Sequence, residues 1–123
     1  MLQIAVQNDV DIIMRTFLQS GIPYDPQCLV VTAVEQDRGV LGYCIFRIHG
    51  EICRVFAING AADDVLADGL LRAALNLALN RGAVTALITG GDKPVAISEL
   101  LACRHCGCGI SPPENLKPRK QTT

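Results

Sequence analysis

The sequence has no tryptophan and few other aromatic residues: two tyrosines and three phenylalanines among 123 residues. Half of the residues are nevertheless hydrophobic, so the core must consist mainly of alanine, leucine, valine and isoleucine. This mixture is typical of helices packed on a β-sheet, and the length allows one such core. We therefore expect a mixed α/β fold with a single domain over residues 1–110. Residues 111–123 carry three prolines and three basic residues without periodicity, which predicts a disordered tail.

An excess of charge of either sign is also absent, since eleven basic residues face twelve acidic ones. Without a global field we expect no nucleic-acid partner and no membrane partner. The N-terminus lacks a basic start followed by an apolar stretch, and the most apolar segment is broken by Asp68, Arg72 and Asn76. These features favour a cytoplasmic protein, whose six cysteines we expect to be reduced thiols or metal ligands.

Two strand-like segments occupy the middle of the sequence. Gly42–Ile48 and Ile52–Ile58 are rich in isoleucine, valine and aromatic residues, and they meet at His49-Gly50, which predicts a hairpin. If His49-Gly50 is the two-residue turn, Cys44 and Cys53 share one face as diagonal neighbours.

In the same register Arg47 and Arg54 share the opposite face of the hairpin. Two interpretations remain open for them: they receive an anion, or they extend over the core to reach water. We expect His49 to be a solvated turn residue.

A long apolar helix follows the hairpin. Leucines and alanines recur at helical spacing around Leu70, which predicts a helix over Asp64–Arg81. Asp63 or Asp64 is suited to cap its start, and Gly82 to follow its end.

The flanking segments complete the order β-α-β-β-β-α-β-α. We expect both faces of the sheet to be covered, because neither face of the hairpin is purely polar. The expected elements are a strand over Leu2–Gln7, a helix from Val10 to near Gly21 capped by Asn8 or Asp9, a strand over Leu29–Glu35, a strand over Val84–Thr89, and a helix from Val95 to about Cys103 that begins behind Pro94.

Cysteines concentrate near the C-terminal end, at Cys103, Cys106 and Cys108, with His105 between them. The spacing is that of one zinc knuckle, but a structural zinc needs four ligands, normally from two such halves. We therefore expect small buried thiols and no bound metal, with zinc or redox chemistry as the alternatives.

Together these elements resemble the GNAT superfamily of acyl-CoA-dependent N-acyltransferases. The likeness runs from Leu2 to about Gly109 and is strongest in Val40-Leu-Gly-Tyr with its hairpin and in the helix from Leu70 to Ala83. It implies a GNAT-like fold shortened at the C-terminus. It also implies binding of acetyl-CoA or another acyl-CoA, and transfer of the acyl group to a small-molecule amine.

The family binds the pyrophosphate of acyl-CoA on the loop and helix start that follow the fourth strand. The resemblance places this site at the following residues: Ile58, Ala62, Asp63, Asp64, Val65, Leu66 and Ala67. Against the family pattern Q/R-x-x-G-x-G/A, only Ala67 matches. Asp63, Asp64 and Asp68 bring negative charge to where phosphate would bind, and such like charges disfavour it.

The remaining site residues also follow from the resemblance. The position of the family's tyrosine acid holds Cys103, or Leu100 if the alignment slips by one helical turn, and Glu51 is the carboxylate near the strand that often supplies a base. Cys103 and Glu51 are thus the candidate catalytic residues. Tyr24 and Asp25 lie where the family lines its acceptor pocket, although a Pro-bounded turn explains them as well.

Two functions stay open at this stage. One is an N-acyltransferase, and the other is a catalytically degenerate GNAT-like domain that binds a ligand or partner. The family normally adds two closing strands, so an uncovered edge along Val84–Thr89 also predicts a homodimer, unless Cys108-Gly-Ile110 covers that edge.

Overall fold

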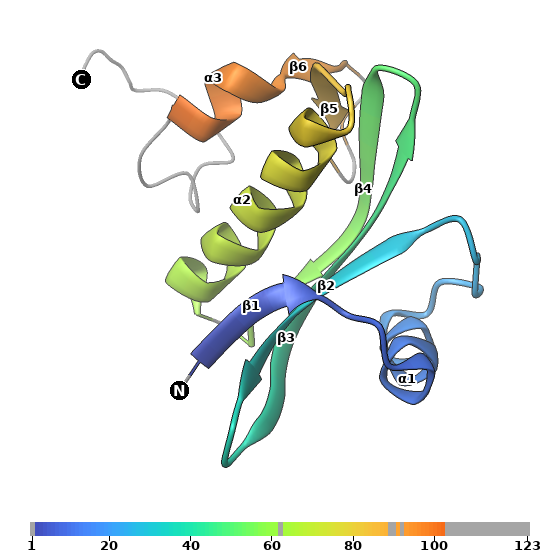
Figure 1. Cartoon of the computed structure of the whole chain (residues 1–123), viewed down its shortest axis with the longest axis vertical. Coiled ribbons are helices and arrows are strands. Elements are labelled where there is room, and N and C mark those ends of the chain that lie inside the picture. Colours follow the sequence, from blue (N-terminus) through green and yellow to red (C-terminus); the bar gives the residue numbers. More distant parts are fainter. Residues whose placement is uncertain (1, 62, 89–90, 92, 103–123) are drawn as a thin grey trace.

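The computed structural model describes residues 2–61, 63–88, 91 and 93–102, and within them the chain forms one mixed sheet with three helices (Figure 1). The strands lie in the order β1-β2-β3-β4-β5-β6, and every neighbouring pair is antiparallel except the parallel pair β4 and β5. The elements are β1 (Leu2–Val6), α1 (Val10–Ser20), β2 (Leu29–Glu35), β3 (Gly39–His49), β4 (Ile52–Asn59), α2 (Asp64–Asn80), β5 (Thr85–Leu87), β6 (Val95–Ala96) and α3 (Ile97–Ala102). The predicted α/β fold is confirmed, with β6 as an addition. No helix among the described residues is long and apolar enough to span a membrane.

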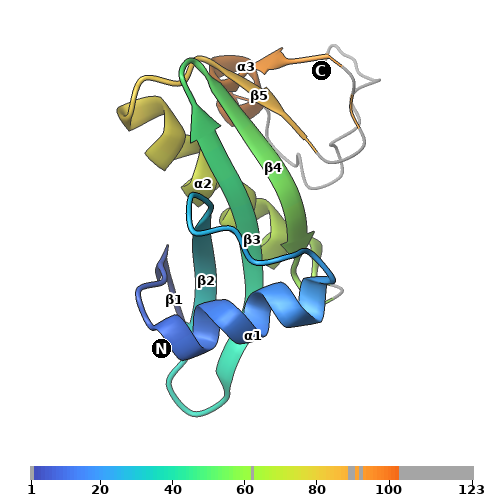
Figure 2. The same ribbon diagram turned by 90° about the vertical axis from the view of Figure 1, so that its right-hand side faces the viewer.

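The two longer helices cover opposite faces of the sheet, as Figures 1 and 2 show. On one face α2 buries a row of leucines and alanines against the inward side chains of β3 and β4. On the other face, called the α1 face below, Phe17 packs with Val30, Tyr43 and Ile45. The expectation that both faces are covered is therefore confirmed for the part of the sheet that α1 crosses.

Local capping explains where these helices begin and end. Asp9 caps α1 through its side chain, and Gly21 ends it in the left-handed conformation with φ of 77°. Asp63 caps α2 in the same way, while the helix ends one residue earlier than predicted, at Asn80.

The turn of the β3–β4 hairpin differs from the prediction. The central residues are Gly50 and Glu51, and Gly50 supplies the positive φ (60°) that a hairpin turn needs at its first central position. This moves the register by two residues, so Cys53 pairs with Ile48 and not with Phe46. A shift of two keeps the side chains of β4 up to Val55 on their predicted faces.

Cys44 and Cys53 consequently share the buried α2 face, as predicted. They are not diagonal neighbours, because Cys44 pairs with Ile58. An extra residue also enters β4 at Phe56, between the pairs Phe46 with Val55 and Ile45 with Ala57. Such a bulge increases the local twist of the strand.

The last helix begins later than predicted. Val95 and Ala96 form the short strand β6 and pair with Ala86 and Thr85, so α3 begins at Ile97. The homodimer was predicted because the edge along Val84–Thr89 was expected to be uncovered. Strand β6 covers this edge at Thr85 and Ala86. The alternative cover, Cys108-Gly-Ile110, and the predicted tail over 111–123 lie outside the described residues.

The buried cysteines make the free energy of unfolding depend on pH in the alkaline range. Burial raises the pKa of the Cys53 thiol from its ordinary 9.0 to about 11, and it also raises the pKa of Cys44. The folded chain then keeps protons that the unfolded chain releases, so the stabilisation is complete below the unfolded pKa and is lost as pH rises through the folded pKa.

We expect the free energy of unfolding to fall between about pH 9 and pH 11, with Cys53 responsible for roughly 2 kcal/mol. Urea unfolding of the natural chain and of Cys53→Ala across this range measures the difference. Val55→Ala, which truncates a neighbouring buried residue that does not titrate, should keep the natural pH dependence. If the free energy of unfolding of Cys53→Ala fell with pH as much as that of the natural chain, the prediction would be contradicted.

Candidate functional site

The junction between β4 and α2 is held together by close contacts between backbones. A Cβ atom added to Gly60 would lie 2.7 Å from the amide nitrogen of Ala67, and one added to Gly42 would lie 2.5 Å from the carbonyl oxygen of Asn59. Ala61, which follows Gly60, adopts a left-handed conformation with φ of 54°, and its amide donates to Oδ1 of Asn59 at 2.9 Å. The loop therefore lies directly on the first turn of α2.

Four amide groups around the start of α2, those of Asp63, Val65, Leu66 and Ala67, are already used within the chain. Oδ1 of Asp63 accepts from the amides of Val65 and Leu66, at 3.0 and 3.2 Å. The carbonyl of Asp63 accepts from the amide of Ala67 at 3.0 Å, and the amide of Asp63 donates to the carbonyl of Gly60 at 2.9 Å. A phosphate binds a helix start through unpaired N–H groups. In this conformation these four amides of the predicted cofactor segment, which is described here except for Ala62, are thus not available to a pyrophosphate.

The other two residues of that segment are placed differently. Ile58 is half-buried and packs on the α2 core cluster, opposite Cys44. Asp64 is exposed in the first turn of α2 and leaves its charge near the helix start.

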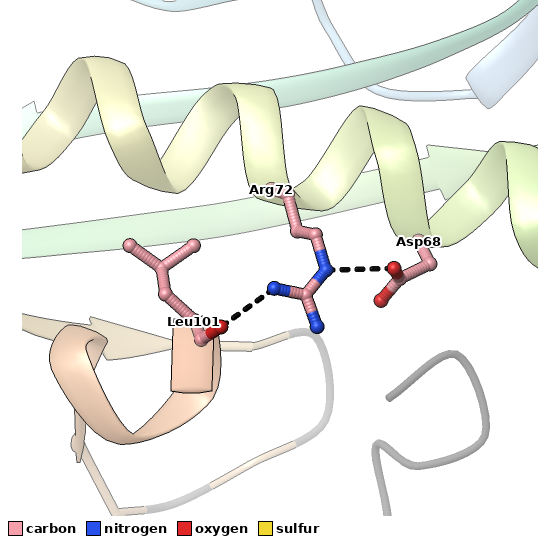
Figure 3. Close-up of polar contacts among 3 residues, drawn as sticks. All are labelled: Asp68, Arg72 and Leu101. Atoms are coloured by element: carbon pink, nitrogen blue, oxygen red, sulfur yellow. Dashed lines mark hydrogen bonds and ion pairs between the residues drawn. The ribbon is translucent and has the colours of Figure 1, made fainter. Parts of the chain in front are cut away.

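Asp68, one turn further along α2, forms an ion pair within the chain (Figure 3). Its Oδ2 accepts from Nε of Arg72 at 2.7 Å, and Nη1 of Arg72 donates to the carbonyl of Leu101 in α3, also at 2.7 Å. The spacing of four residues is the favourable one for a helical ion pair. Asp68 therefore contributes less free negative charge to the helix start than the sequence suggested, and Arg72 fastens α3 to α2.

Strands β4 and β5 are paired over a short distance only. Their register covers Ile52 to Arg54 on β4, and β5 ends at Leu87. Beyond Arg54, β4 continues to Asn59 with β3 as its neighbour in the sheet. The bulge at Phe56 lies in this part of β4 and adds to its twist.

The loop between α1 and β2 lies on the α1 face and contains the predicted acceptor residues Tyr24 and Asp25. The ring of Tyr24 contacts Phe17 edge to face at 5.3 Å, and Oδ2 of Asp25 lies 3.7 Å from Nη1 of Arg47 on β3. An open pocket of about 370 Å³ is lined by this loop and by Phe56. The structure thus places both predicted residues at one pocket.

Cys28 is a further member of this pocket and was not predicted. Burial, assisted by the charge of Asp25, raises the pKa of its thiol to about 11. The thiol is therefore protonated at neutral pH and is a poor nucleophile.

A second groove, of about 460 Å³, is lined by Arg47, His49, Ile52, Arg54 and Phe56. Figure 2 looks onto this face: α1 crosses one end of the sheet, and the hairpin end of β3 and β4 lies beyond the helix. Arg47 and Arg54 pair directly across the two strands, so the prediction that they share a face is confirmed. We call this feature the arginine groove.

The structure describes one of the two candidate catalytic residues, Glu51. Glu51 is exposed in the hairpin turn, at the opposite end of β4 from the loop that leads to Asp63, and the strand between them is about 25 Å long at 3.3 Å per residue. Cys103 lies outside the described residues, as do His105, Cys106 and Cys108. Within the described part, no three histidine, cysteine or acidic side chains gather where they could hold a metal.

Two solved structures, both described as putative acetyltransferases, are similar to this chain. One, from Pyrococcus furiosus, has a TM-score of 0.59 at 12% sequence identity over 100% of both chains. The other, from Exiguobacterium sp. 255-15, has a TM-score of 0.49 at 13% identity over 73% of this chain and 76% of that chain. No family model matches the sequence, and no curated protein matches it. At these identities the likeness concerns the fold.

Proposed function

We propose that this chain, whose fold is GNAT-like as the sequence predicted, is a domain that binds a small molecule on its α1 face and has lost tight binding of acyl-CoA. The observation that carries the proposal is the carboxylate of Asp63, which accepts hydrogen bonds from the amides of Val65 and Leu66. These are the groups on which the resembled family would hold pyrophosphate.

The expected loss of affinity follows from two contributions. Releasing the two amides removes a helix cap, which costs about 1 kcal/mol. The nearby charges of Asp63 and Asp64 oppose a phosphate by a further 1 kcal/mol or so each at an exposed site. Together these contributions amount to about 3 kcal/mol and weaken binding by roughly 100-fold, since each 1.4 kcal/mol is about a factor of ten.

A second candidate function is transfer of an acyl group from acetyl-CoA or another acyl-CoA to a small-molecule amine. The end of the pairing between β4 and β5 at Arg54 favours acyl transfer, because an extended cosubstrate requires an unpaired strand edge. This part of β4 lies beside the pocket of Tyr24, Asp25 and Phe56. In this candidate Glu51 and Cys103 would be the groups to test for proton transfer.

Calorimetry with acetyl-CoA separates the two candidates. We expect no submicromolar binding by the natural chain, and tighter binding by at least tenfold in the double variant Asp63→Gly, Asp64→Lys. That variant frees two amides and changes the local charge from negative to positive.

Asp9→Gly is the matched control, because Asp9 caps α1 through the same two-amide geometry. It should leave the affinity for acetyl-CoA unchanged. Submicromolar binding by the natural chain would overturn the proposal and support acyl transfer.

A further inference from the structure

We infer that the arginine groove binds a small organic carboxylate, with the carboxylate on Arg54 and Arg47 and the apolar part on Phe56 and Ile52. The inference names the ligand class of the binding domain proposed above and rests on that proposal. It is carried by the pairing of two arginines over an apolar floor on a part of the sheet that α1 does not cover (Figure 2).

The two arginines are like charges on directly paired positions. Such cross-strand neighbours are destabilising in the absence of a counter-ion. Asp25 lies 3.7 Å from Arg47 and offsets one of the two charges. The guanidinium of Arg54 has no ion-pair or hydrogen-bond partner among the described residues, so one positive charge of the pair is not compensated there.

The apolar floor distinguishes this groove from two solvated arginines. Ile52 is 39% exposed although it lies within a strand, and Phe56 is half-buried at the bulge. Phe56 also lines the loop pocket, so the two hollows share one aromatic surface. A ligand that combines an anion with an apolar body would bury this surface and pair Arg54 at the same time.

The charge count selects a monoanion. Arg47, Arg54 and Asp25 together carry a net charge of +1 when His49 is neutral. A carboxylate matches this charge, and its two oxygens match the planar fork of a guanidinium. A phosphate monoester brings a second negative charge close to Asp25, which disfavours it.

An NMR titration of the full chain with phenylacetate tests the inference. We expect saturable shifts at Arg54, Phe56 and Ile52, with a dissociation constant on the order of 0.1–1 mM, as for small ligands of few atoms. Phenylacetamide, the neutral analogue, should bind at least tenfold more weakly, and phenyl phosphate should bind more weakly than phenylacetate.

Variants identify the group responsible. Arg54→Gln should weaken phenylacetate binding at least tenfold without lowering the melting temperature, because it removes a like-charged neighbour of Arg47. Arg54→Lys should give an intermediate affinity, since the charge remains and the fork is lost. Arg38→Gln, which removes the same charge from the exposed β2–β3 turn, should bind like the natural chain.

Equal binding of phenylacetamide and phenylacetate, or an Arg54→Gln variant with natural affinity, would overturn the carboxylate site. Tighter binding of phenyl phosphate would overturn the choice of carboxylate. None of these outcomes depends on acetyl-CoA, so failure of this inference and failure of the proposed function remain distinguishable.

Discussion

Replacement of Leu70 by aspartate is expected to leave the chain unfolded at room temperature. Leu70 lies at the middle of α2, is fully buried, and belongs to the cluster that joins the helix to β3 and β4. A carboxyl group there would have no partner. Its burial costs several kcal/mol even when it takes up a proton and becomes neutral. This cost is comparable with the whole stability of a small domain.

Circular dichroism and thermal melting of Leu70→Asp measure the effect. Leu79→Asp is the matched control, because Leu79 lies on the same helix and is 42% exposed. It should melt within a few degrees of the natural chain, which corresponds to roughly 1 kcal/mol or less. A Leu70→Asp variant with an unchanged melting temperature would show that the described face of α2 is not the packed one.

Replacement of Gly42 by alanine is expected to cost about 1–3 kcal/mol, although it adds one methyl group. The new Cβ would lie 2.5 Å from the carbonyl oxygen of Asn59 and 3.0 Å from Cδ1 of Leu70. The first contact is with backbone and cannot be relieved by a rotamer change. The end of β4 must therefore move away from β3, and the start of α2 with it.

Urea unfolding of Gly42→Ala tests this, with Gly69→Ala as the control. Gly69 lies on α2, and a Cβ there meets only the flexible end of Ile4, at 3.1 Å. Alanine in a helix is about 1 kcal/mol better than glycine, so the control should be as stable as the natural chain or more so. Equal stability of Gly42→Ala and the natural chain would contradict the close packing of Gly42 against the end of β4 and against Leu70 of α2.

Local chemistry predicted most of the fold. The capping aspartates Asp9 and Asp63 and the left-handed Gly21 mark helix ends through their own side chains or conformation, so their signals are readable in sequence. The β-branched run Leu29–Glu35 gave a strand with the same bounds as predicted. These features depend on neighbours within a few residues.

The hairpin register and the last strand were not predictable in the same way. Gly50 fits either central position of a two-residue turn, and the choice depends on how the whole sheet pairs. The bulge at Phe56 has no local signal. Strand β6 has two residues and exists because Thr85 and Ala86 offer it a partner.

The candidate site shows the same division. That Asp63 blocks the helix start was expected from the sequence, because capping is local. The pair of Asp68 and Arg72 has a readable spacing of four residues, and it was missed because Asp68 was considered only as a charge near a phosphate. The approach of Asp25 to Arg47 joins residues 22 positions apart, and no sequence pattern predicts it.

The most direct measurement of the central claim is an NMR titration of one isotope-labelled sample, first with acetyl-CoA and then with phenylacetate. The account predicts that acetyl-CoA at low micromolar concentration leaves the amide signals of Val65 and Leu66 in place, because Asp63 already accepts from both groups. It predicts that phenylacetate shifts the signals of Arg54 and Phe56 instead. Saturation of the Val65 and Leu66 shifts by acetyl-CoA at that concentration would contradict the account.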